Sequence, residues 1–135
     1  MQLDIRRFST VAEYITEAKR EIDEAAGRTR AKYITTVQGQ AETYQMKAAD
    51  AEAYKAAGYP ADTTNHPWVA AEAAAQGKTP QQATDFLLAT RAQWVQLGTE
   101  IERVRLQGKI AVAAATTIHG VLAAKRAAIA ALEAM

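Results

Sequence analysis

The sequence contains no cysteine and only three prolines and seven glycines. The absence of cysteine excludes disulfide bonds and metal sites built on thiolates. No stretch approaches the roughly 18 consecutive apolar residues of a membrane span, and Met1–Arg7 lacks the apolar core of a signal peptide. We therefore expect no membrane partner and a protein kept in the cytoplasm, or carried out of it only within a larger particle.

An excess of charge of one sign is also missing. The 16 basic and 15 acidic side chains leave a formal net charge of +1, which creates no general field to attract nucleic acid. In the most basic part of the second half, Glu100 precedes Arg103 by three residues, the spacing of an ion pair on a helix. Glu102 precedes Arg105 by the same interval. The pattern predicts a solvated helix face, with both arginines pointing away from the core, and no nucleic-acid partner.

The usual marks of catalysis are absent. His66 and His119 are isolated, and neither has another histidine at metal-pair spacing. We interpret His66 as a surface or capping side chain and His119 as solvated. The sequence has no Glu-x-x-His pair, no glycine-rich phosphate loop and no nucleophilic serine motif. These absences predict a protein that is not an enzyme and that takes no cofactor, metal or small-molecule substrate.

What the sequence does contain is alanine, the best helix former, at roughly a quarter of all positions. This composition predicts an all-α fold in a single helical domain over residues 1–135. Thr10 and Glu13 form a capping box, so we expect a first long helix over 11–57, with a kink or break between Gly27 and Gly39. Met1, Leu3 and Ile5 alternate with polar residues and predict at most a short extended segment before it.

Turn and start signals then divide the rest of the chain. Gly58-Tyr59-Pro60 ends the first helix and opens a connecting region over 58–79. Within it, Pro67 and Gly77 bound a short helix over 67–76. Thr79-Pro80-Gln81-Gln82 combines a threonine cap, proline at the first helical position and the glutamine of a capping box. We expect a helix over 80–134 from this signal.

Apolar or small residues recur along this last helix at alternating spacings of three and four, the pattern of a coiled-coil seam. We name these positions the heptad ladder. Its large members are the candidate interface residues Leu87, Trp94, Leu97, Ile101, Val104, Ile118, Leu122, Ile129 and Leu132. Its middle is small, with Gly108, Ala111 and Ala115, so that another helix can approach closely there.

Two architectures fit this pattern. The favoured one is a long antiparallel hairpin in which the helices over 11–57 and 80–134 face each other, with its tip near residues 62–77. The other is a small bundle in which the last helix breaks at Gly98, Gly108 or Gly120. In the hairpin, the stripe from Ile118 to Leu132 is left partly uncovered, which predicts a partner from another chain or from a second copy.

A family resemblance suggests a biological setting. The resemblance covers residues 30–116, and these motifs carry it: Tyr33-Ile34-Thr35, Gly39-Gln40, Tyr44, Lys47, Glu52-Ala53-Tyr54, Trp94, Ile101-Glu102, Arg105 and Lys109. Together they resemble small tail-region proteins of tailed bacteriophages and prophages. The resemblance implies a virion component or an assembly factor, found in the host cytoplasm during assembly and in the virion tail if retained. It implies no catalytic or ligand-binding residue.

We therefore expect a structural or assembly protein of a phage tail that packs against fibre, baseplate or tube proteins, and that is a homo-oligomer. Two alternatives remain open: a tail or tail-fibre assembly chaperone that is absent from the finished particle, and a cytosolic coiled-coil adaptor unrelated to phage.

Overall fold

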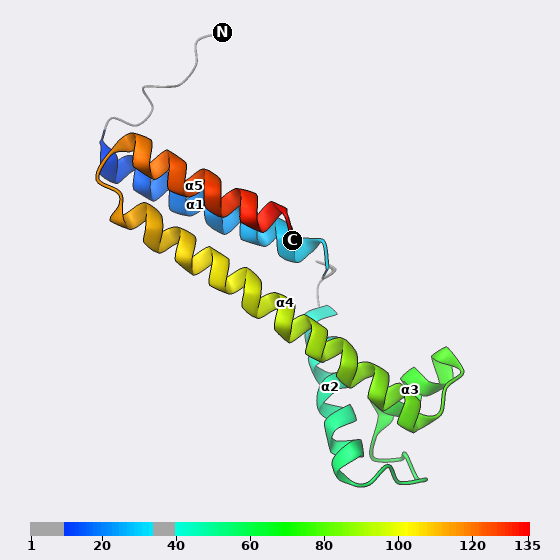
Figure 1. Cartoon of the computed structure of the whole chain (residues 1–135). Helices are drawn as coiled ribbons and strands as arrows, with labels where there is room; N and C mark the ends of the chain where they lie inside the picture. The colour runs from blue at the N-terminus through cyan, green and yellow to red at the C-terminus, as the bar shows by residue number, and fades with distance from the viewer. Residues whose placement is uncertain (1–9, 34–39) are drawn as a thin grey trace. The chain divides into compact units, whose positions relative to one another are not determined.

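The computed structural model describes residues 10–33 and 40–135, and within them the chain is all-α, as the sequence predicts. The helices are α1 (Val11–Ala31), α2 (Gln40–Ala56), α3 (Pro67–Gln76), α4 (Pro80–Ala114) and α5 (Ile118–Glu133) (Figure 1). The possible extended segment at Met1–Ile5 lies outside the described residues.

The predicted start and stop signals are confirmed by their hydrogen bonds. The Glu13 amide donates to Thr10 Oγ1 at 3.2 Å at the start of α1. At the start of α4 the capping box is reciprocal, since the Gln82 amide donates to Thr79 Oγ1 and the Thr79 amide donates to Gln82 Oε1, both at 3.1 Å. Gly77 follows α3 in the left-handed conformation, with φ at 64°, which a residue without a Cβ adopts at little cost.

The first long helix predicted over 11–57 is two helices. α1 ends at Ala31 and α2 begins at Gln40, so the break falls in the interval that Gly27 and Gly39 predicted, although residues 34–39 lie outside the described part of the chain. α2 then ends near the predicted stop, where Gly58 has φ at 84°.

By its internal contacts the chain divides into two units, and the single domain predicted from the sequence stays a prediction. Unit 1 comprises residues 1–34 and 98–135, and unit 2 comprises residues 35–97. Unit 1 therefore holds α1, the second part of α4 and α5, whereas unit 2 holds α2, α3 and the first part of α4.

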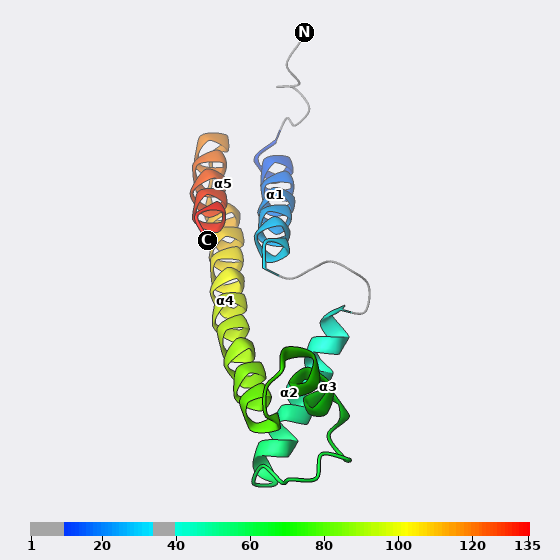
Figure 2. The same cartoon turned by 90° about the vertical axis from the view of Figure 1, so that its right-hand side faces the viewer.

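In unit 1, α1 and α5 lie side by side and run in the same direction (Figures 1 and 2). Lys125 pairs with Glu21 at 2.8 Å, and the Thr29 hydroxyl donates to the Leu132 carbonyl at 3.0 Å. The later residue of α1 thus contacts the later residue of α5, as in a parallel pair of helices. α4 runs antiparallel to α1, as the predicted hairpin requires, since Arg30 pairs with Glu102 whereas Asp23 pairs with Lys109.

The continuous helix predicted over 80–134 is wrong. α4 ends at Ala114, and Thr117 caps α5 by accepting from the Gly120 amide at 3.0 Å. The break lies at none of the three glycines that the sequence offered: Gly98 and Gly108 lie inside α4, and Gly120 lies inside α5. Its physical reason is packing, because the turn lets α5 fold back along α1. α1 of the same chain thus covers most of the stripe that the hairpin would have left open, although Ile118 at its start is 37% exposed.

In unit 2 a small core joins all three helical segments. It consists of Ala51 and Tyr54 from α2, Val69 from α3 and Leu87 from α4, with Tyr59 and Leu88 packed against it. The Tyr54 hydroxyl also donates to the Pro60 carbonyl at 2.6 Å and so holds the loop that follows α2. This core fixes the connecting region predicted over 58–79 onto α2 and α4.

Candidate functional site

The core of unit 1 is built from one side chain stripe of each helix. Ile22 of α1, Ile101 and Val112 of α4, and Val121 and Leu132 of α5 are all buried. Gly108 lies where α4 packs tightly against α5 and α1: a Cβ built there would lie 2.6 Å from Ala128 Cβ and 3.4 Å from Ile22 Cδ1. Of the small section of the heptad ladder, Gly108 thus serves close packing within one chain, whereas Ala111 is exposed.

The buried positions depart from the ladder beyond Gly108. Val112 is buried and Ala111 is exposed, and on α5 Val121 and Ala128 are buried whereas Ile118 is exposed. A straight α-helix repeats every 3.6 residues and drifts from a strict seven-residue repeat by about 20° per heptad. Within α4 the core therefore follows the true helical period, so that the ladder position Ala111 faces solvent. On α5, which a turn separates from α4, the buried positions follow the packing of that helix on α1.

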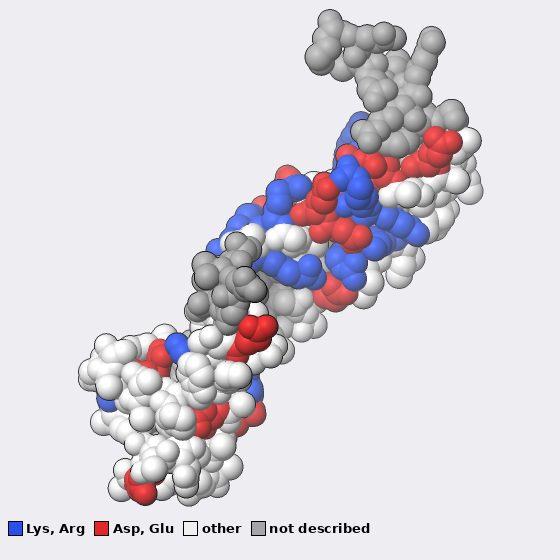
Figure 3. Space-filling model, turned by 180° about the vertical axis from the view of Figure 1, so that it is seen from behind, with Lys and Arg blue, Asp and Glu red and all other residues white. Residues whose placement is uncertain are grey.

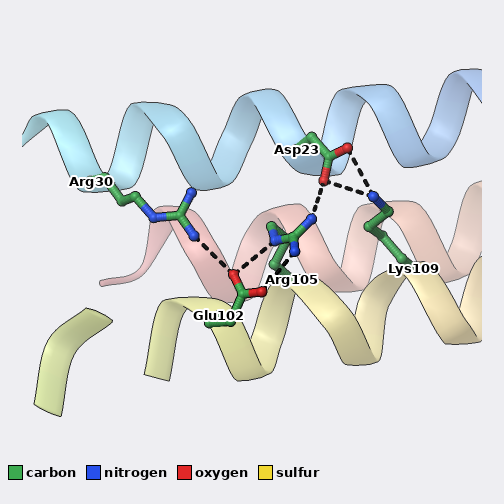
Figure 4. A network of polar contacts seen from close by, with 5 residues as sticks. All are labelled: Asp23, Arg30, Glu102, Arg105 and Lys109. Carbon is green, nitrogen blue, oxygen red and sulfur yellow. Dashed lines mark hydrogen bonds and ion pairs between the residues drawn. The ribbon is translucent and has the colours of Figure 1, made fainter. Parts of the chain in front are cut away.

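A polar network lies beside this core and joins α1 to α4 (Figure 4). Arg105 pairs with Glu102 on its own helix at 2.7 Å and with Asp23 on α1 at 2.8 Å. Lys109 reaches Asp23 at 3.0 Å, and Arg30 reaches Glu102 at 3.0 Å. Each carboxylate is thus shared between two cations from different positions along the interface.

These contacts correct one prediction and confirm another. The intrahelical pairs of Glu100 with Arg103 and of Glu102 with Arg105 form as their spacing predicted. Arg105, however, does not point away from the core: its side chain is 23% exposed and is directed towards α1, where it pairs with Asp23. Sequence spacing could not reveal this because its partner Asp23 is 82 residues away.

The network shifts the acidity of its carboxylates. Burial on its own raises the pKa of Asp23, but the hydrogen bonds from Lys109 and Arg105 outweigh it and hold that pKa below its ordinary value. The hydrogen bond from Arg105 likewise lowers the pKa of Glu102. Both carboxylates are therefore stabilised in their charged form by the fold.

Charged side chains of both signs are intermingled on the face of unit 1 that the space-filling view shows (Figure 3). In unit 1 as a whole, several charged side chains are paired within or between helices, including Arg20 with Glu17 and Glu24, and Lys125 with Glu21. The face seen in this view therefore presents no broad area of a single sign.

The second part of α4 also carries large apolar side chains on its solvent side. Ile110 is 67% exposed and Leu106 is 45% exposed. Ala113 and Ala114 are exposed one turn later, at the three- and four-residue spacings that place side chains on one face of a helix. We name these four residues the α4 outer face. It lies on the helix side opposite Ile101, Val104 and Val112.

The nine candidate interface residues thus fall into different environments. Leu87, Ile101, Val104 and Leu132 are buried in the cores of the single chain, and Ile118 is 37% exposed. The other four are half-buried: Trp94, Leu97, Leu122 and Ile129. The residues of the α4 outer face were not among those nine, because the ladder was assigned to the other side of the helix.

Unit 2 contains a second polar cluster that sequence reasoning missed. Asp50 of α2 accepts from the Val69 amide at 2.9 Å and lies 3.1 Å from His66 Nδ1. The ring of Tyr54 meets His66 edge-on, with centroids 5.1 Å apart. Asp50 therefore caps α3 from another helix, satisfying an amide that has no partner inside α3.

The structure thus corrects the interpretation of His66. It occupies the cap position of α3, yet its side chain makes no cap hydrogen bond and is directed to Asp50 instead. No local motif marks Asp50, which lies 19 residues before the amide that it caps. His119 is exposed, as predicted.

Two further features of the structure bear on the class of site. In the part of the chain that the structure describes, no group of three or more His, Cys, Asp or Glu side chains is arranged to hold a metal ion. Among the same residues, no helix is both long and apolar enough to cross a membrane.

Comparison with known proteins gives no match, whether to a family model, to a curated protein or to a solved structure.

Proposed function

We propose that this protein is a non-enzymatic helical component or assembly factor of a phage tail that binds another tail protein through the α4 outer face. The observation that supports this proposal most directly is the exposure of Ile110 and Leu106, which lie one helical turn apart on α4. Contiguous exposed apolar side chains are typical of protein-binding surfaces.

The physical fit favours a helical partner. The apolar residues of this face lie along one helix at spacings of four, three and one residue, so that an apolar helix from a fibre, baseplate or tube protein can pack along it, in the manner of helices that interdigitate side-chain ridges. The phage setting rests on the resemblance of residues 30–116 to tail-region proteins.

The experiment that tests this proposal uses virions produced from a genome that encodes the full chain. Ile110→Ser removes the most exposed apolar side chain, and Ala123→Ser, at an exposed site on α5, adds the same hydroxyl elsewhere. We expect mass spectrometry to find the wild-type chain and the Ala123→Ser chain in purified tails and the Ile110→Ser chain depleted.

The outcomes separate the alternatives. A chain absent from finished particles, but needed for tails to form, would identify an assembly chaperone. Tails that form normally without the gene, together with a chain absent from every tail intermediate, would refute the proposal.

A further inference from the structure

We propose that α5 exchanges between two copies of this chain, so that α4 and α5 join into one helix and each α5 packs on α1 of the other copy. This inference does not depend on the phage setting or on the α4 outer face. It rests on the connection between α4 and α5 and on the part of the heptad ladder that the monomer leaves unused.

The connection is short and can become helical. It consists of Ala115, Thr116 and Thr117, without glycine or proline. A helix break leaves amides and carbonyls without partners inside either helix. At this break, the Ala115 amide donates to the Val112 carbonyl at 3.3 Å and the Gly120 amide donates to Thr117 Oγ1. A continuous helix would replace these bonds by regular intrahelical ones.

The sequence also continues its ladder through the break. Ala111, Ala115 and Ile118 keep the alternating spacing of four and three, yet Ala111 and Ile118 are exposed in the folded chain. In the joined helix these positions would form one stripe across the former turn. Two such helices crossing there would cover the stripe, which gives these positions a packing role that the monomer lacks.

Exchange preserves the contacts that hold α5. The pair of Lys125 with Glu21 and the bond from Thr29 to the Leu132 carbonyl would form between copies instead of within one. The closed and exchanged forms then differ mainly in the turn and in the entropy of association. This near-equivalence is why domain swapping is a low-cost route to a dimer.

Two substitutions in the turn should shift the equilibrium between the closed monomer and the exchanged dimer in opposite directions. Thr117→Ala removes the cap of α5 and favours the joined helix. Loss of such a cap shifts the equilibrium between the closed turn and the joined helix roughly fivefold towards the joined helix. Because an exchanged dimer contains two of these helices, its association constant should rise by about 25-fold. Ile118→Pro locks the turn, because proline suits the first helical position and Thr117 before it already has an extended backbone, with ψ at 154°.

Sedimentation of the full-length chain, refolded at high concentration and then diluted, measures the dimer. We expect dimer from the wild type, more from Thr117→Ala and none from Ile118→Pro. Thr16→Ala is the matched control, since its hydroxyl bonds to the Ala12 carbonyl inside α1 and has no part in the turn. Circular dichroism melts verify that each variant is folded, and a Gly-Ser-Gly insertion after Ala115 provides a second way to favour the closed form if Ile118→Pro does not fold.

Cross-linking then distinguishes exchange from other dimers. The chain has no cysteine, so Glu21→Cys and Lys125→Cys can be placed in separate copies, mixed, refolded together and treated with a short bis-maleimide. Exchange predicts a covalent heterodimer that is lost in the locked variant. A chain that stays monomeric throughout, or a dimer that survives Ile118→Pro without this cross-link, would overturn the inference.

Discussion

At Gly108 the absence of a side chain sets the distance between α4 and α5. An added methyl group would lie 2.6 Å from Ala128 Cβ, on a residue with no rotamer to change, and 3.4 Å from Ile22. We therefore expect Gly108→Ala to lower the free energy of unfolding by about 1 to 3 kcal/mol, as overpacking does.

Gly27 provides the matched control for that substitution. It lies in α1 of the same unit, and an added Cβ would meet nothing within 4 Å. Gly27→Ala should raise the free energy of unfolding by up to about 1 kcal/mol, because alanine is the better helix former. Denaturant unfolding measures both variants. Equal effects of the two substitutions would show that the helices do not approach at Gly108.

Asp50 is the residue on which the start of α3 depends. Asp50→Ala would leave the Val69 amide and the His66 ring without their carboxylate partner, at a cost of about 1 to 3 kcal/mol. Glu52, two residues along the same helix, pairs with Arg91 at the surface, where ion pairs contribute little. Thermal melts should therefore show a clear loss for Asp50→Ala and almost none for Glu52→Ala; the reverse order would contradict the capping role.

At the scale of the element, the helix boundaries were predictable where a few adjacent residues determine them. Thr10, Thr79 and the Pro67 to Gly77 interval mark their boundaries by local hydrogen bonds and backbone geometry, which the neighbouring sequence encodes. The end of α4 was not predictable in this way. Its alanines and threonines permit either a helix or a turn, and the fold-back of α5 onto α1 decides between them.

The same distinction holds for the candidate surfaces. Pairs such as Glu102 with Arg105 follow from spacing on one helix, whereas the link from Arg105 to Asp23 needs the packing of α1 against α4. The heptad pattern also could not predict which residues of late α4 face the core. An α-helix drifts from a strict seven-residue repeat, so that after several heptads the pattern no longer distinguishes Ala111 from Val112.

The network between α1 and α4 makes a prediction about pH. Since the fold lowers the pKa of Asp23 and of Glu102, each contributes stability above its unfolded-state pKa and loses it as the pH falls through the lower folded-state value. The free energy of unfolding should therefore decline from about pH 5 downward. Asp23→Asn should flatten this decline, as measured by denaturant unfolding across the acid range, and an unchanged slope would exclude Asp23 as a contributor.

At the scale of the whole molecule, one helix carries both a core stripe and an exposed apolar stripe. Ile101 is 1% exposed, whereas Ile110, nine residues later on the same helix, is 67% exposed. Truncation of each isoleucine therefore tests a different property, because it removes the same atoms from two different environments. The buried position tests the stability of the chain, and the exposed position tests its proposed association.

We expect Ile101→Ala to lower the free energy of unfolding by about 2 to 5 kcal/mol, through lost burial and the cavity left behind. Ile110→Ala removes a side chain that already contacts water, so its free energy of unfolding should change by no more than about 0.5 kcal/mol. In a binding assay with the proposed tail-protein partner, the order of the two effects should invert: Ile110→Ala should bind more weakly than Ile101→Ala while remaining folded. Thermal melts and sedimentation of the mixture measure the two effects separately. An Ile110→Ala chain that melts early and binds normally would place Ile110 in the core and remove the α4 outer face as a binding surface.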